Sequence, residues 1–295
     1  MDRRSFLSSL GAVAVAPTLA ACARGASTAD STGPMAQSAA RLPLGVQLYT
    51  VRSEMAKSVE QTLARLAQLG YREVEFAGYY GRTPAQVKAA LAAAGLTAPS
   101  AHLGLDLLTG EKRAQTLADA AAIGHEWVVL PWLAPNQRGG IDGYKRLATT
   151  MNDIASAAQQ AGLKFAYHNH DFELTPVDGQ LPLEVLMAET DAARVKFELD
   201  VYWTVKAGTD PLAFLNAHPG RIAMLHLKDA TAAPAREMAS VGAGTIDWAA
   251  VLARGIAKGT VSHAFVEHDN PSDVWASVSA SAAWLKGQGL VASRG

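Results

Sequence analysis

Two histidines and two carboxylates stand together in the segment KFAYHNHDFEL, residues 164–174. His168 and His170 are two residues apart, so a β-strand through them would direct both imidazoles to one face. Asp171 and Glu173 follow directly. Imidazoles and carboxylates are side chains that ligate divalent metals and transfer protons near neutral pH. The segment therefore indicates either a metal and acid/base site or the polar end of a strand that meets water.

Three later segments share a feature, a pair of polar side chains two residues apart near the end of an apolar run. The pairs are Glu198 and Asp200 in FELD, His226 and Lys228 in LHLKD, and Glu267 and Asp269 in FVEHD. An unpaired carboxylate is costly to bury, so groups in such places must be paired or bound to a metal. We therefore expect the four segments to share one divalent cation. The expected ligands are Asp200, His226, Glu267 and one histidine of the first segment, with His168 favoured over His170.

Mixed nitrogen and oxygen ligands suit several divalent ions, and the sequence does not choose among Mn²⁺, Co²⁺, Fe²⁺, Zn²⁺ and Mg²⁺. Such a cation would polarise a substrate carbonyl or stabilise an enediolate. Structural roles are the alternative for each residue. His226 would then pair with a neighbour in the core, and Asp200 would cap the loop after its strand. Glu267 would form an ion pair with Lys228.

Other polar and aromatic residues are candidates for contacts with a substrate. Glu75 and His102 end expected strands in the first half of the chain, and Gln47 lies on the first expected strand. Trp132 and Trp203 have the flat apolar face on which a sugar ring can stack, with a core or rim position as the alternative. Lys228 offers a cation beside the expected metal ligands.

The elements that must position these residues alternate between β-rich and helical segments. The helical segments are clearly delimited; Thr83 precedes Pro84 as an N-cap, for example, and Gly95 follows the same segment. The β-rich runs are residues 44–51, 73–78, 99–105, 127–133, 164–172, 195–203, 222–229 and 263–269.

Eight strand–helix units in residues 42–289 predict an α/β fold, a (β/α)8 TIM barrel. A doubly wound open sheet is disfavoured because no glycine-rich dinucleotide turn follows the first strand. Barrel active sites lie at the carboxyl ends of the strands, where the polar pairs occur.

The first 22 residues, MDRRSFLSSLGAVAVAPTLAAC, are predicted to be a twin-arginine export signal. They end in LAAC, which resembles a lipoprotein processing box, so Cys22 is the expected lipidation site. Residues 23–41 are small and polar and predict a flexible linker, and residues 290–295 form a short tail. The expected location is the periplasmic side of the cell envelope, with a lipid anchor as the only membrane attachment.

The net charge of −1 provides no basic surface for a nucleic acid backbone, so we expect no nucleic acid partner. The expected partner is a small sugar. No feature of the sequence specifies an oligomeric state.

The chain resembles the xylose isomerase-like barrel superfamily, and within it the sugar phosphate isomerase/epimerase branch. The motifs that carry the resemblance are FELDVYWTVKAG (197–208), HLKD (226–229), VGAGTIDW (241–248) and FVEHDNP (265–271). The resemblance implies a metal held by residues of strands five to eight, of which Asp200, His226 and Glu267 match. It also implies that the strand-eight Glu267 exchanges a substrate proton.

The sequence departs from this family at strand five, where many members have a glutamate and this chain has His168. Proton transfer then falls to His168 or His170, or Glu173 supplies a carboxylate from the loop. The YHNH version is similar to inosose dehydratases and to relatives that cleave keto-sugars.

The resemblance implies proton abstraction beside a carbonyl, which begins isomerisation, epimerisation and β-elimination alike. Our leading expectation is a metal-dependent isomerase or epimerase acting on an unphosphorylated keto-sugar or polyol ketone. The alternatives are a lyase or dehydratase acting on a 3-keto-sugar, a 3-keto-glycoside or an inosose, and a non-catalytic sugar-binding lipoprotein.

Overall fold

The described residues are built on a closed barrel of parallel strands. The computed structural model describes residues 41–257 and 261–292. The strand order around the barrel is β1-β10-β7-β6-β5-β4-β3-β2. The eight strands are β1 Gly45–Gln47, β2 Glu73–Ala77, β3 Thr97–His102, β4 Trp127–Leu130, β5 Lys164–His168, β6 Val195–Asp200, β7 Ile222–Leu227 and β10 His263–Val266. The predicted TIM barrel is therefore confirmed.

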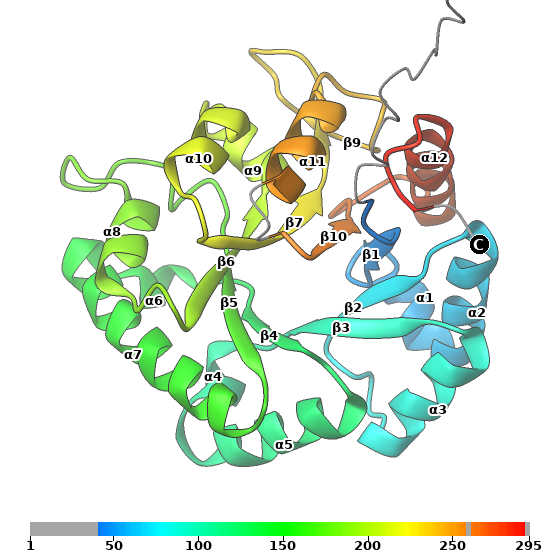
Figure 1. The fold of residues 1–295 in the computed structure, drawn as a ribbon, viewed down its shortest axis with the longest axis horizontal. Helices are drawn as coiled ribbons and strands as arrows, with labels where there is room; N and C mark the ends of the chain where they lie inside the picture. The colour runs from blue at the N-terminus through cyan, green and yellow to red at the C-terminus, as the bar shows by residue number, and fades with distance from the viewer. Residues whose placement is uncertain (1–40, 258–260, 293–295) are drawn as a thin grey trace, which may run out of the picture. The chain divides into compact units, whose positions relative to one another are not determined.

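Helices lie around the outside of the strands (Figure 1). The longer ones are α2 Val59–Leu69, α3 Pro84–Ala94, α5 Arg113–Ile123, α7 Gly140–Gln160, α8 Pro182–Glu189, α10 Pro211–Ala217, α11 Trp248–Ala257 and α12 Val274–Gly287. Shorter helices follow several strands. They are α1 Arg52–Lys57, α4 Leu105–Leu108, the 3-10 helix Gly110–Lys112, α6 Pro135–Arg138 and α9 Val201–Lys206.

Local sequence signals define the helices as expected. At the start of α3, the Thr83 side chain accepts a hydrogen bond from the backbone N–H of Gln86. The Gln86 side chain in turn accepts one from the backbone N–H of Thr83. The helix ends at Gly95, whose left-handed backbone (φ 65°) suits glycine. Val59, Leu63 and Leu66 of α2 share one buried face, as their spacing predicts. The core forms where these faces meet the outer faces of the strands.

The strands are shorter than the sequence patterns predicted, and this difference matters for the site. The run 195–203 was expected to be one strand, but β6 ends at Asp200 and α9 begins at Val201. The Asp200 side chain accepts a hydrogen bond from the backbone N–H of Trp203 at 2.9 Å, so it caps α9. Likewise β5 ends at His168, which leaves His170 in the following loop.

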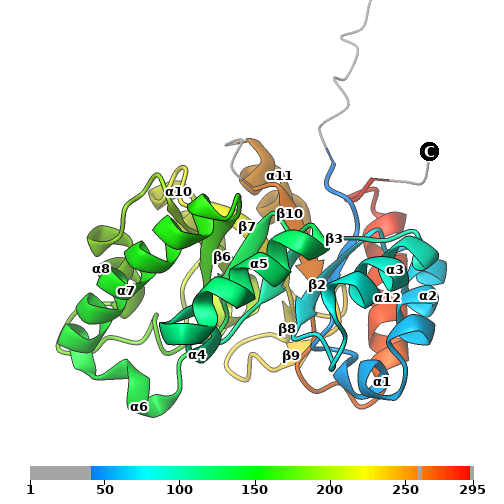
Figure 2. The same ribbon diagram turned by 90° about the horizontal axis from the view of Figure 1, so that it is seen from below.

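The short elements gather at one end of the barrel. Figure 2 shows α1, α6 and the hairpin of β8 (Asp229–Ala230) and β9 (Met238–Ala239) at the same end. These elements follow β1, β4 and β7, so this end carries the carboxyl ends of the strands. The hairpin was not anticipated from the sequence.

The glycine-containing turn in VGAGTIDW is held by a carboxylate. The Asp229 side chain accepts from the N–H groups of Gly242 and Ile246 and from Trp248 Nε1. A Cβ on Gly244 would lie 2.2 Å from Asp229 Oδ1, so glycine is required there. These three donors are therefore already used by Asp229.

The proposed export signal, Cys22 and nearly all of the linker lie outside the described residues. Among the described residues, no helix combines the length and apolar character needed to span a bilayer.

Candidate metal centre and active site

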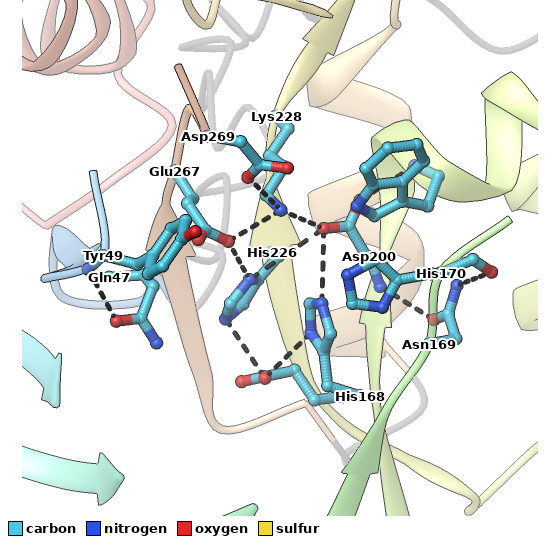
Figure 3. Close-up of polar contacts among 12 residues, drawn as sticks. Gln47, Tyr49, His168, Asn169, His170, Asp200, His226, Lys228, Glu267 and Asp269 are labelled. Carbon is cyan, nitrogen blue, oxygen red and sulfur yellow. Dashed lines mark hydrogen bonds and ion pairs between the residues drawn. The ribbon is translucent and has the colours of Figure 1, made fainter. Parts of the chain in front are cut away.

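Two imidazoles at the carboxyl ends of β5 and β7 stand between two groups of carboxylates. The upper group, nearer the open end of the barrel, is Asp200 and Glu267. His226 Nδ1 lies 2.7 Å from Glu267 Oε2 and 4.0 Å from Asp200 Oδ2. His168 Nε2 lies 3.7 Å from Asp200 Oδ2. All four residues are buried, and Figure 3 shows their side chains converging. The structure thus brings together the four side chains that were predicted to be metal ligands.

The lower carboxylates, Glu75 and Glu198, contact the opposite nitrogens of the same rings. His168 Nδ1 lies 3.2 Å from Glu198 Oε2, and His226 Nε2 lies 2.6 Å from Glu75 Oε2. His102 Nε2 joins this lower group at 2.7 Å from Glu198 Oε2. Each imidazole therefore has one nitrogen toward the upper group and the other fixed by a carboxylate below.

Glu75 is itself held in place by two donors. Gln47 Nε2 donates to Glu75 Oε2 at 2.7 Å, and the Ser100 hydroxyl donates to Glu75 Oε1. Gln47 and Glu75 were predicted to contact substrate, but both are fully buried beneath the imidazoles. Their position suits orientation of His226 better than contact with a ligand.

The upper residues suit a divalent cation. Asp200, His226 and Glu267 each offer one ligand atom, all within 4.8 Å of one another. Asp200 Oδ2 is buried and accepts no well-directed hydrogen bond. A metal-binding histidine generally donates the N–H of its other ring nitrogen to a carboxylate. Glu75 and Glu198 are placed to accept such hydrogen bonds from His226 and His168. A second set, His102, His168, Glu198 and His226, also has donor atoms within 4.8 Å.

One lysine side chain stands among the upper carboxylates. Lys228 Nζ lies 3.0 Å from Asp200 Oδ2, 2.8 Å from Glu267 Oε2 and 2.7 Å from Asp269 Oδ1. Lys228 is almost completely buried (Figure 3). The structural alternatives are therefore also realised, because Asp200 caps α9 through Oδ1 while Glu267 pairs with Lys228. In Asp200 the two roles use different oxygens, which leaves Oδ2 facing the cluster.

Electrostatic coupling sets the charges of this cluster. Burial alone would raise the pKa of Glu75, but His102 and His226 together hold it well below its usual range. Burial would lower the pKa of His102, but Glu75 and Glu198 raise it to about 9. Burial raises the pKa of Asp200 to about 6, against the attraction of Lys228.

His170 differs from the other imidazoles. Burial, and then the nearby Lys228 ammonium, lower the pKa of His170 to about 3, so the ring is neutral near pH 7. Its Nδ1 is buried without a hydrogen-bond partner. The ring lies 5.3 Å from the Trp203 ring, measured between centroids, and stacks on Phe172. The His170 side chain also lines the pocket described below.

Glu173 does not join the cluster. Its carboxylate accepts hydrogen bonds from the Tyr167 hydroxyl and from the His170 backbone N–H at 2.7 Å. Tyr167 neighbours His168 on β5 and therefore points to the opposite face of the strand, away from the barrel interior. The idea that Glu173 replaces the missing strand-five glutamate is therefore corrected: Glu173 fastens the loop that carries His170.

A pocket of about 630 Å³ opens above the cluster. His168, Lys228 and Glu267 lie on its lining, as does His102, which was predicted to contact substrate. Trp203, a predicted stacking platform, is not among the lining residues; it packs edge-on against Tyr202. The remaining lining residues are Tyr49, Ala77, Gly78, Gly104, Leu107, Pro131, Trp132, His170, Asp269 and Asn270.

Sequence reasoning did not assign roles to several residues that build the site. Glu198 was recognised only as a partner of Asp200 on one strand face, yet it contacts three imidazoles. Asp269 forms an ion pair with Lys228, as Asp200 and Glu267 do. Asn169 Oδ1 accepts a hydrogen bond from the Asp200 backbone N–H at 3.0 Å. The two-residue spacing of Glu198 and Asp269 from predicted ligands was the available signal.

The fold is a (β/α)8 barrel with a candidate metal site at the carboxyl ends of its strands, and sequence comparison identifies the family. The model of the family described as "Xylose isomerase-like TIM barrel" matches residues 63–288. The chain belongs to this family.

Individual relatives are sugar-acting proteins. The chain is 26% identical over 194 residues to an inosose dehydratase of Geobacillus kaustophilus. This match covers 58% of this chain and 61% of the relative. Matches to other curated inosose dehydratases span as little as 28% of the relative's length. The chain thus spans between 28% and 63% of the length of these curated relatives.

Solved structures share the fold. A sugar phosphate isomerase/epimerase from Parabacteroides distasonis superposes with a TM-score of 0.72 at 24% identity, covering 88% of this chain and 99% of that one. The 3-keto-D-glucoside 4-epimerase YcjR from E. coli gives 0.65 at 16% identity, covering 84% and 100%. The protein IOLI, solved with a bound zinc atom, gives 0.65 at 15% identity, covering 84% and 97%.

Proposed function

We propose that this protein is a divalent-metal-dependent enzyme that abstracts a proton beside the carbonyl of an unphosphorylated keto-sugar or a related polyol ketone. Isomerisation or epimerisation is the leading outcome. The observation that carries the proposal is the convergence of His168, Asp200, His226 and Glu267 under a pocket that also exposes the neutral His170. Sugar isomerases, epimerases and dehydratases in the same family support it.

The cation would be held by Asp200, His226 and Glu267, with His168 beside them. When bound, it would stabilise negative charge on the substrate oxygen. Glu75 and Glu198 orient the two imidazoles by accepting from their lower nitrogens. His170 is the group we assign to proton transfer, because its imidazole lines the pocket beside the proposed metal ligands. Lys228 and His102 are placed to donate to substrate oxygens from the pocket floor.

The test is turnover of keto-sugars by the full-length protein after chelation and reloading with Mn²⁺, Co²⁺ or Zn²⁺. His170→Asn should lower kcat by about 10²–10⁴, the usual contribution of a general base, without changing metal content. His218→Asn is the matched control, because His218 pairs with Glu184 on the outer helices. Turnover by the chelated protein at the full rate would exclude the metal-dependent mechanism. Unchanged kcat in His170→Asn would exclude His170 as the base.

A second candidate function is β-elimination by a lyase or dehydratase. The specific observation in its favour is the similarity to inosose dehydratases. Elimination produces an enone or diketone that absorbs in the ultraviolet, whereas epimerisation does not. The same reactions followed by ultraviolet absorbance and by sugar analysis therefore separate the two outcomes. Binding of keto-sugars without either product would instead indicate a sugar-binding protein.

We also propose export through the twin-arginine route and lipid attachment at Cys22, on the basis of the Arg3–Arg4 pair and the LAAC segment. Cys22→Ala should release the protein from the membrane fraction and abolish labelling by a fatty acid analogue. Persistent labelling of this variant would exclude Cys22 as the acylated residue.

A further inference from the structure

Two large aromatic side chains are exposed at the mouth of the pocket. Within residues 41–257 and 261–292, the exposed large hydrophobic side chains are Tyr49 (41% exposed) and Trp132 (46%). Both belong to the pocket lining. They follow β1 and β4, which lie in different parts of the barrel wall. Exposed aromatic surface confined to one opening marks a place where a ligand is bound.

Tyr49 is held in a fixed position. The Arg52 guanidinium lies 4.0 Å from the centroid of the Tyr49 ring and donates to the Tyr49 carbonyl at 2.8 Å. The same guanidinium donates to the Asp269 carbonyl at 2.8 Å and to Asn270 Oδ1 at 2.9 Å. The Tyr49 backbone N–H donates to Gln47 Oε1 at 3.0 Å. The ring is thus tied to segments after β1 and β10, and little conformational entropy remains to be lost on binding.

The segment that carries Trp132 is also held by an arginine. The Arg138 guanidinium lies 5.8 Å from the Trp132 ring and 3.4 Å from the centroid of Phe172. Arg138 also donates to the Leu133 carbonyl at 3.2 and 3.1 Å. The loop that carries Trp132 is therefore fastened to the loop after β5.

The pocket changes character between its floor and its mouth. The floor carries ionisable groups, among them His168, Lys228 and Glu267. The lining also includes the apolar residues Ala77, Leu107 and Pro131, and the volume is about 630 Å³. A ligand that fits has a polar ring at one end and a second group with a flat apolar face at the other.

We propose that Tyr49 and Trp132 form a subsite for a second ring, so that the substrate is a glycoside and not a free monosaccharide. The reacting keto-sugar ring occupies the floor, and the ring attached through its glycosidic oxygen stacks on the aromatic faces at the mouth. The placement of the reacting ring rests on the proposed function. The aromatic subsite rests on the exposure and fixation of Tyr49 and Trp132 alone. A second sugar and an aryl group share the required chemistry, a ring with an apolar face.

The experiment measures binding without turnover. Methyl β-glucoside, phenyl β-glucoside and cellobiose, none of which carries a ketone, are titrated calorimetrically into metal-loaded full-length protein. Phenyl glucoside or cellobiose should bind about tenfold more tightly than methyl glucoside, which corresponds to one aromatic stacking contact. Trp132→Ala should remove most of this advantage and leave binding of methyl glucoside unchanged. Trp275→Ala is the matched control, because Trp275 also stacks on an arginine but lies on α12 outside the pocket.

Each outcome decides the proposal. An advantage for phenyl glucoside alone assigns an aryl group to the subsite, and an advantage for cellobiose assigns a sugar. Equal binding of all three ligands, equal loss of all three in Trp132→Ala, or no binding of any ligand would overturn the subsite. Because none of these ligands reacts, failure of catalysis in the keto-sugar assay leaves this test intact. Conversely, loss of the subsite leaves turnover of small keto-sugars as an independent test of the proposed function.

Discussion

Replacement of Lys228 by methionine should strengthen metal binding. The Lys228 ammonium lies 3.0 Å from Asp200 Oδ2 and 2.8 Å from Glu267 Oε2, the same oxygens that the proposed cation would use. A protonated amine has no lone pair and cannot act as a ligand. The lysine and a metal therefore compete for these two carboxylates, and binding requires the ammonium to move toward Asp269, whose Oδ1 lies 2.7 Å from Nζ.

The size of the effect follows from the charges. Two unit charges about 4 Å apart interact by about 4 kcal/mol at an effective dielectric constant of about 20. This is an upper bound, because Lys228 keeps part of its attraction by turning toward Asp269. A net gain of about 1–3 kcal/mol is expected, which lowers the Kd for the metal about 5- to 150-fold. The metal-free variant should also melt earlier, because three carboxylates lose their shared cation.

The assay is competition with a fluorescent chelator for Mn²⁺ or Zn²⁺, together with thermal melting with and without metal. Lys286→Met is the control for general loss of a positive charge, because Lys286 bonds to the Leu69 carbonyl on the outer helices. Asp269→Asn should have the opposite effect and weaken metal binding, and it should have less effect when combined with Lys228→Met. An unchanged or weakened Kd in Lys228→Met would refute the competition.

Three further predictions follow from the same contacts. His168→Ala should reduce bound metal measured by atomic emission, whereas His170→Ala should retain it, and equal loss in both would contradict the assignment of different roles. Glu75→Gln should weaken metal binding because Nε2 of His226 loses its anionic acceptor; the expected loss is about 10- to 100-fold in Kd, and an unchanged Kd would show that Glu75 does not orient the ring. Burial raises the pKa of Glu173 to about 7, so the folded state holds its proton more tightly than the unfolded state and stability falls as pH rises from about 4.5 to 7. In denaturant unfolding, the free energy of unfolding should fall between pH 5 and pH 8 by on the order of 2–3 kcal/mol less in Glu173→Gln than in the unmodified protein. The same fall in both proteins would exclude this role of Glu173.

The Glu173 prediction also shows where the resemblance misled. A carboxylate five residues after His168 was a reasonable substitute for the missing strand-five glutamate. The strand ends at His168, however, and the chain then turns so that Glu173 accepts bonds from Tyr167 and from the His170 N–H. A hydrogen-bonding partner on the outer face of β5 decides this placement, and no spacing rule contains that information.

The sequence by itself determined the barrel, the positions of its eight strands and the set of His168, Asp200, His226 and Glu267. These follow from local physics: apolar periodicity, capping residues, and the cost of burying ionisable groups on apolar strands. Only the tertiary structure decided which atoms meet. His168 and His226 each lie between an upper and a lower carboxylate, Lys228 lies among three carboxylates, and Glu75 contacts His226. These contacts depend on the register between strands that are distant in sequence. Side-chain spacing within one strand specifies a face, whereas the register between strands specifies the partner.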